Sequence, residues 1–423
     1  NTARCCPTRA ALLSGVYQHQ AGIGLMTGDK QLPGYRGELG RDVVSIAEAL
    51  GTAGYRRYMA GKWHVTRHVG PNGPKDNWPL QRGFEKFYGT IIGAGSFYDP
   101  ATLCRGNTYI TPLNDPKYTP KTYYYTDAIS DNAVTFLKQH ADESPDKPFF
   151  LYTAYTTAHW PMHALPQDIA KYKGKFDDGW DVLREHIYER QLALGVIPPD
   201  TALTPRPDQV PSWDEYPDRY KPVASRLMEV FAAFMAHTDA QVGRLLDAID
   251  ELGVGDDTLV VYLTGDNGAS AEGTIHGAWS APSFQNGVHE DPEWLLEHMD
   301  DFGSERCENH FNVGWAWALD SPFQWMKQVA SHFGGTRNAI AISWPQKIKA
   351  AGELRTQFHH VIDIAPTIYE IVGIEAPEFV NGIKQMPIHG TSMTYSFESA
   401  SSPSTHKTQY FEILGNRAMY HEG

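Results

Sequence analysis

Cysteine is scarce in this sequence, which has four cysteines among its 423 residues. So few thiols exclude a small scaffold held together by disulfides. A bridge between Cys104 and Cys307 and a full set of free thiols are both compatible with the sequence. Cysteine usage therefore leaves the redox compartment open.

Long apolar runs and an excess of positive charge are also missing. No stretch of about 18 apolar residues occurs, so we expect no transmembrane helix. The net charge of −14 at pH 7 argues against a nucleic acid as partner. An anionic ligand would therefore need a local pocket of cationic side chains. The length and the 41% hydrophobic content are typical of one large globular domain or of two domains.

The sequence does contain a motif with a candidate nucleophile, Cys5, close to its start, between Cys5 and Gly15. Pro7 suits the first position of a helix, and Gly15 suits its end. The pattern therefore places Cys5 at a helix N-terminus, where free N–H groups favour an anion. Arg9 follows one turn later, so its guanidinium can reach back toward Cys5. A nucleophile in this position suits attack on a tetrahedral oxyanion ester, although a buried cysteine before an ordinary helix is the alternative interpretation.

The motif reads Cys-x-Pro-x-Arg and, after three more residues, Leu-Ser-Gly. This pattern resembles the signature of the sulfatases. The resemblance implies that a formylglycine-generating maturation enzyme oxidises Cys5 to formylglycine. Only Cys5, and not the adjacent Cys6, has proline and arginine at the required offsets.

A second motif follows a predicted strand and reads Gly61-Lys62-Trp63-His64. If the extended conformation continues through it, Lys62 and His64 point to the same side, because side chains alternate along a strand. An isolated Lys-x-His is usually a solvated surface pair. Here it resembles the second sulfatase motif, which implies that Lys62 binds the sulfate and that His64 acts as a base.

A third candidate lies behind the apolar run of residues 149–155, which predicts a buried parallel strand. His159 follows this strand and resembles the family histidine that contacts the sulfate and its leaving oxygen. The rival interpretation is a zinc pair of His159 and His163 at helical spacing. Pro161 disfavours the helix that this pair would need.

Hard oxygen ligands follow the clearest predicted strand, residues 258–264. Asp266 and Asn267 lie between two glycines and could bind calcium or magnesium. This loop resembles the metal loop of the sulfatases, which implies Ca²⁺, with Mg²⁺ as the alternative, held by Cys5 (as formylglycine), Asp266 and Asn267. The family takes further carboxylates from an upstream strand. We expect that strand to be missing here, and metal binding by this chain to be weak.

Lys327 precedes a Gly-Gly-x-Arg element at residues 334–337, as the sulfate-binding lysine of the family does. Many relatives carry glutamate where this chain has His332. The alignment of Lys327 with the family lysine can therefore shift by one residue. Elsewhere, residues 222–252 predict a long helix that carries His237 in a packing or surface role. Residues 166–220, rich in proline and aromatic side chains, read as a long surface excursion without regular structure.

The resemblance implies an α/β fold with a mostly parallel central sheet flanked by helices, as in alkaline phosphatase and the sulfatases. We assign residues 1–395 to the catalytic domain, without its N-terminal strand, and residues 396–423 to the start of a truncated C-terminal subdomain. The motifs resemble those of the larger bacterial arylsulfatases. The compartment stays open between a bacterial periplasm and the cytoplasm, because any signal region lies outside this chain.

The implied reaction is hydrolysis of a sulfate ester, most readily an aryl sulfate, to sulfate and an alcohol or phenol. A hydrated formylglycine at position 5 would attack sulfur, with Arg9, Lys62, His159 and Lys327 holding the anion and the leaving oxygen. His64 would then release the sulfate. Two alternatives remain: a formylglycine-dependent phosphonate monoester or phosphodiester hydrolase, and an inactive sulfatase-like fragment.

Overall fold

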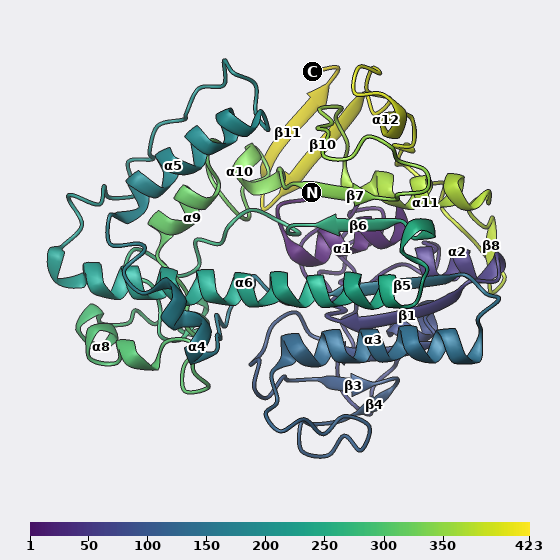
Figure 1. The fold of residues 1–423 in the computed structure, drawn as a ribbon, viewed down its shortest axis with the longest axis horizontal. Helices are drawn as coiled ribbons and strands as arrows, with labels where there is room; N and C mark the ends of the chain where they lie inside the picture. Colours follow the sequence, from purple (N-terminus) through teal and green to yellow (C-terminus); the bar gives the residue numbers. More distant parts are fainter.

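The computed structural model describes residues 1–423, apart from the side chain of Gln285. A central sheet has the strand order β4-β3-β2-β1-β5 (Figure 1). Its members are β1 (Arg56–Gly61), β2 (Lys86–Thr90), β3 (Leu103–Arg105), β4 (Thr108–Tyr109) and β5 (Phe149–Ala154). Strand β1 pairs in parallel with both β2 and β5, whereas β3 and β4 add an antiparallel edge. The prediction of a mostly parallel sheet in an α/β fold is therefore confirmed.

Alternating residues of the central strands pack into two different cores. Tyr58 and Ala60 of β1 belong to the core shared with α3 (Tyr125–Glu143) and α6 (Lys221–Glu251). Met59, between them, packs into the core shared with α1 (Cys5–Ser14). The alternation follows from the period of two along a strand, and burial on both faces is what a parallel sheet requires.

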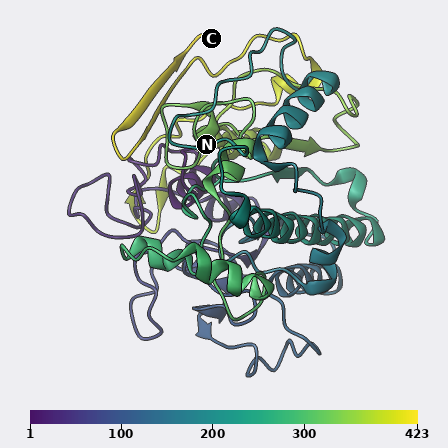
Figure 2. The ribbon, with the colours of Figure 1, turned by 90° about the vertical axis from the view of Figure 1, so that its left-hand side faces the viewer.

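Two shorter antiparallel pairs complete the β-structure around the site. Strand β6 (Val260–Leu263) pairs with β7 (Ile340–Ser343) as a separate two-stranded sheet. This pair packs on α11 (Ile364–Val372) and on residues of α1 and α2 (Ile46–Thr52) in a third core. The β10–β11 hairpin, Thr408–Ile413 with Asn416–His421, lies beside the N-terminal segment (Figure 2). There the ring of Tyr410 lies 4.9 Å from that of Tyr17.

The expectation of a long irregular excursion at residues 166–220 is wrong. This stretch contains α4 (Pro166–Ile169) and the 16-residue helix α5 (Gly179–Leu194). Trp180 of α5 is fully buried, with its ring 4.7 Å from that of Trp213 and 5.6 Å from that of Trp315. The aromatic side chains that suggested a surface segment build a core between α5 and α9 (Val313–Leu319) instead.

The remaining elements are short: α7 (Ala281–Gln285), α8 (Pro292–Glu297), α10 (Phe333–Thr336), α12 (Tyr395–Glu398), and the pair β8 (Phe379–Val380) and β9 (Ile383–Lys384). Cys104 and Cys307 are buried free thiols. None of the described helices is both long enough and apolar enough to span a membrane.

Candidate active site

Helix α1 positions Cys5 at its first turn. The helix begins at Cys5 itself and ends before Gly15, which adopts the left-handed conformation with φ 69°. The start lies two residues earlier than expected, so Pro7 occupies the first turn, where its missing N–H leaves no intrahelical bond unmade. Cys5 is 2% exposed and Arg9 is 7% exposed, so the motif faces the interior of the protein.

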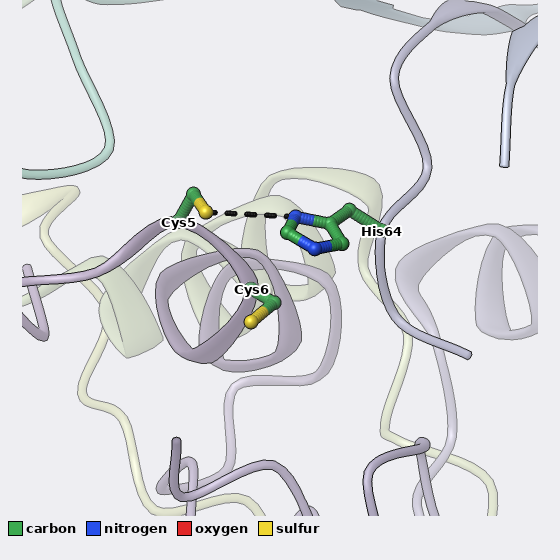
Figure 3. Close-up of side chains that lie close together, drawn as sticks. All are labelled: Cys5, Cys6 and His64. Carbon is green, nitrogen blue, oxygen red and sulfur yellow. Dashed lines mark hydrogen bonds between the residues drawn. The ribbon is translucent and has the colours of Figure 1, made fainter. Parts of the chain in front are cut away.

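Cys5 and His64 lie together, with the Cys5 Sγ 3.5 Å from the His64 Nδ1 (Figure 3). The neighbouring Cys6 thiol lowers the pKa of Cys5 well below its usual value, and the positive charges of Lys62 and His64 act in the same direction, whereas burial opposes them. Burial raises the pKa of Cys6. The thiol at position 5 is therefore the one that the surroundings favour as an anion.

Cys6 points away from the reacting atoms. The ligand atoms of Cys5, Cys6 and His64 lie within 4.8 Å of one another. The Cys6 sulfur, however, contacts the Leu25 carbonyl and the Met26 Sδ, both at 3.4 Å. Its environment is that of a core side chain.

Lys62 and His64 follow β1 rather than extending it. The strand ends at Gly61, and His64 has a φ of 59°, so the expected strand alternation does not continue to this residue. Both side chains are nevertheless buried beside Cys5, which contradicts the alternative of a solvated surface pair. Burial lowers the pKa of Lys62, and the Cys5 charge partly opposes that effect. Burial also lowers the pKa of His64, which favours a neutral imidazole able to accept a proton.

Arg9 ties the helix to the loops that follow the strands. Its Nε donates to the Asp266 Oδ2 at 3.1 Å, and its Nη1 donates to the Lys62 carbonyl at 2.9 Å. The same Nη1 lies 3.3 Å from the Tyr152 hydroxyl. Thr8, one residue earlier, donates to the Asp266 carbonyl at 2.7 Å. The loop after β6 is therefore held directly against α1.

The loop after β6 offers oxygen atoms to a cation. The Asn267 Nδ2 donates to the Gly268 carbonyl at 2.8 Å, whereas the Asn267 Oδ1 is buried and has no hydrogen-bond partner among the described residues. An orphaned buried oxygen is costly unless a ligand satisfies it. With the neighbouring Asp266 carboxylate it makes a pair of hard donors, so the side chains present fit a calcium or magnesium ion.

His159 lies in the loop after β5 and reaches the same group of charges. Its Nδ1 lies 2.8 Å from the Trp160 carbonyl. Burial lowers the pKa of His159 strongly, and the positive charges of Lys327 and Lys62 lower it further. His163 lies elsewhere: its ring bonds the Phe97 N–H and the Cys307 carbonyl. The zinc pair of His159 and His163 is therefore excluded, because both nitrogens of His163 are engaged.

Lys327 is buried and pairs with a carboxylate that the sequence did not reveal as part of the site. The Lys327 Nζ lies 2.9 Å from the Glu272 Oε2, and both side chains are largely shielded from solvent. The Lys327 N–H donates to the Ala269 carbonyl at 3.0 Å, which fixes Lys327 against the β6 loop. The one available signal for Glu272 was its place six residues after Asp266 in a loop that leaves a strand.

The eight side chains predicted for the site thus converge around the N-terminus of α1. The charges of Lys62 and His64 act on Cys5, and those of Lys62 and Lys327 act on His159. Arg9 connects the Lys62 backbone to Asp266. Such a pocket can bind a tetrahedral anion beside a nucleophile and a cation, which describes ester hydrolysis at an anionic centre.

Comparison with known proteins gives the same family as the motifs. The sulfatase family profile, described as "Sulfatase", matches residues 1–374. The arylsulfatase of Klebsiella aerogenes is 30% identical over 420 residues, covering 97% of this chain and 84% of the relative. An uncharacterized sulfatase of Schizosaccharomyces pombe is 31% identical over 395 residues, covering 88% of this chain and 67% of the relative.

Solved structures agree on the fold. The crystal structure titled "Ps i-CgsB in complex with k-i-k-neocarrahexaose" superposes with a TM-score of 0.60 at 20% identity, covering 99% of this chain and 71% of that one. Members of the sulfatase family generally depend on a formylglycine and a metal ion. Because the profile spans most of the chain and the arylsulfatase relative spans nearly all of it, the protein belongs to the sulfatase family and is a sulfuric ester hydrolase.

Proposed function

We propose that the protein hydrolyses aryl sulfates, with Cys5 in its formylglycine form as the nucleophilic residue and Ca²⁺ as the metal. The observation that supports this most directly is the position of Cys5, buried at the start of α1 within 3.5 Å of His64. The N–H groups of the first helical turn and the cations around them favour a tetrahedral anion at this point.

Lys62, His159 and Lys327 bind the sulfate group in this proposal. Lys62 and Lys327 are buried cations, 1% and 6% exposed, so water screens their charges weakly. Charges that are already in place when the substrate arrives stabilise the negative charge of the transition state without reorganising. The overall charge of −14 makes this local pocket the part of the protein suited to an anion.

The two histidines divide the proton transfers. His64 accepts a proton at residue 5, since its Nδ1 lies next to the Cys5 side chain and burial favours its neutral form. His159, in the loop after β5, donates a proton to the departing phenol or alcohol oxygen, for which it has to be protonated against the burial and the two lysine charges that lower its pKa. In this proposal His64 is therefore the general base and His159 the general acid.

Asp266 and Asn267, together with residue 5, would hold the cation. Their oxygen atoms suit Ca²⁺ and, with tighter geometry, Mg²⁺. When formed, formylglycine supplies a hydrated aldehyde oxygen as nucleophile, and a maturation enzyme of the formylglycine-generating class is the partner that this requires. Residues 1–395 would form the catalytic domain and residues 396–423, with the β10–β11 hairpin, the start of a second unit.

The test is expression together with a formylglycine-generating enzyme, followed by mass spectrometry of the peptide that carries Cys5 and Cys6. We expect loss of the thiol at Cys5 alone, and turnover of 4-nitrophenyl sulfate that needs Ca²⁺. The Cys5→Ala variant should abolish turnover, whereas Cys6→Ala should retain most of it, because Cys6 contacts Leu25 and Met26 instead of the pocket.

Parallel assays decide between substrate classes. A phenyl phosphonate monoester and a sulfated saccharide are offered to the same preparation. Faster turnover of the phosphonate than of the aryl sulfate, or conversion of Cys6 instead of Cys5, would contradict the proposal.

A further inference from the structure

A single, largely shielded carboxylate, that of Glu272, accepts hydrogen bonds from four donors at the edge of the sulfate pocket. The Glu272 Oε2 accepts from the Lys327 Nζ at 2.9 Å and from the Trp160 Nε1 at 3.1 Å. The Ser270 hydroxyl donates to the same oxygen at 3.1 Å. The Glu272 Oε1 accepts from the Gln328 Nε2 at 2.8 Å. Glu272 is thereby joined to the loop after β5, to its own loop after β6, and to the segment that carries Lys327.

The donors of Glu272 stand next to the residue proposed as leaving-group acid. Trp160 follows His159 in the chain, and their rings lie 5.2 Å apart. The groups that act on His159 are the cations Lys327 and Lys62, the Cys5 thiol and the Trp160 carbonyl. Glu272 carries a negative charge on this side of the pocket: burial raises its pKa, but Lys327, His159 and His310 together hold it at about 2.

We propose that Glu272 is a positioning residue for the leaving-group side of the pocket, where its carboxylate fixes the Lys327 ammonium and the Trp160 indole beside His159. This inference rests on the proposed function. It adds that the attractive charge of Glu272 favours the protonated form of His159, which two neighbouring lysines oppose. The side chain of Glu272 touches neither residue 5 nor the cation ligands in this role.

Replacing Glu272 by glutamine distinguishes the effect of the carboxylate charge from that of its hydrogen bonds. A glutamine keeps one oxygen for Lys327 and Trp160, and its amide can donate to Gln328 once the Gln328 amide turns round. The Glu272→Gln variant therefore loses the charge while the hydrogen-bond framework can be retained. The Glu272→Ala variant loses both, because it leaves Lys327 buried without its partner.

The experiment compares aryl sulfates that differ in the leaving phenol, 4-nitrophenyl sulfate and phenyl sulfate, in wild type and Glu272→Gln. A poor leaving group needs the proton from His159 more than a good one does. We expect kcat/KM to fall about 100-fold for phenyl sulfate and about 10-fold or less for 4-nitrophenyl sulfate. The pH above which kcat/KM declines should move to lower values, because protonated His159 has lost an attractive charge.

A second readout needs no turnover. NMR titration of the His159 ring should show a lower pKa in Glu272→Gln than in wild type. Glu272→Asp keeps the charge, so its ratio of kcat/KM values for the two aryl sulfates should stay close to that of wild type. This variant tests the role of the charge if Glu272→Gln folds poorly. Asp115→Asn is the matched control, since Asp115 is a buried carboxylate paired with Arg105 outside the site.

Equal losses for both substrates, together with an unchanged pH profile and an unchanged His159 titration, would overturn the proposal and leave Glu272 a structural residue. Failure of the sulfatase proposal is recognised separately, because wild type itself would then turn over neither aryl sulfate.

Discussion

The Arg9 guanidinium donates to the Asp266 carboxylate over 3.1 Å, although 257 residues separate the two in the chain. The bond joins the helix of the nucleophile to the loop of the proposed cation. A shift of one would therefore move the other, so the distance between nucleophile and cation depends on Arg9.

Replacing Arg9 by lysine should lower kcat/KM for an aryl sulfate by about 100-fold, comparable with the loss of an oxyanion donor. Lysine keeps the charge but lacks the planar fork that reaches Asp266 and the Lys62 carbonyl together. Steady-state kinetics with 4-nitrophenyl sulfate measures the effect. Arg105→Lys, which alters a comparable ion pair with Asp115, serves as control and should leave kcat/KM unchanged.

Lys62 and His64 should differ in the step that they affect. Lys62→Ala removes a buried charge from the anion pocket, so kcat/KM should fall by about 100-fold or more. His64→Ala should slow the later release of sulfate and preserve the first release of phenol. Rapid-mixing kinetics would then show a burst of one phenol per enzyme in His64→Ala. Unimpaired steady-state turnover of that variant would contradict the assignment of His64 as base.

Calcium should bind at the loop after β6. Asp266→Ala and Asn267→Ala each remove an oxygen donor, so both variants should bind Ca²⁺ at least about 10-fold more weakly in calorimetric titration. The gain in thermal stability that Ca²⁺ gives to the wild type should shrink accordingly. Asp300→Ala is a suitable control because this acidic residue belongs to the 3₁₀ turn Met299–Asp301 after α8 and not to the loop after β6. Equal Ca²⁺ binding by all variants would place the ion elsewhere.

His237 should make folding stability depend on pH. Its ring lies between two carboxylates, 2.6 Å from the Asp127 Oδ1 and 3.0 Å from the Asp168 Oδ2, which join α6 to α3 and α4. The pKa of His237 is raised by these two hydrogen-bonded carboxylates, although burial opposes them. A raised folded-state pKa gives stability that is complete below the unfolded pKa, about 6.5, and lost as pH rises through the folded value.

The measurement for His237 is urea unfolding of wild type and His237→Gln at several pH values. The difference in unfolding free energy between the two should be largest below about pH 6 and should decrease toward alkaline pH. His140→Gln is the control, since burial lowers the pKa of that histidine instead of raising it. A difference that does not change with pH would show that His237 is neutral in the fold.

The sequence predicted those helices and strands that are specified by residues close together in the chain. The proline and glycine around α1, the apolar runs of β5 and β6 and the stripe of α6 are short-range signals, and these elements lie where the sequence placed them to within a few residues. The interpretation of His237 as a packing or surface residue did not include its two ion pairs, because the partner carboxylates lie 69 and 110 residues away in the chain.

Other features depend on the tertiary structure and could not be predicted. The aromatic residues of the α5 region look exposed until α9 packs against them. Glu272 is an ordinary loop glutamate in the sequence, and its role depends on Lys327, which the chain brings back from 55 residues further on. The separate pairing of β6 with β7 likewise depends on the partner strand, which the apolar pattern of either strand does not specify.

The burial of Cys5 also bears on the timing of maturation. In the folded chain its side chain is 2% exposed, its backbone belongs to a helix, and the neighbouring Ala10 and Ala11 pack into different cores. An enzyme that binds the Cys5–Arg9 segment and oxidises the Cys5 thiol needs that segment to be extended and exposed to solvent. Any conversion of Cys5 must therefore occur during synthesis of the chain or before α1 packs. If the chain folds before it is oxidised, residue 5 remains an unmodified cysteine.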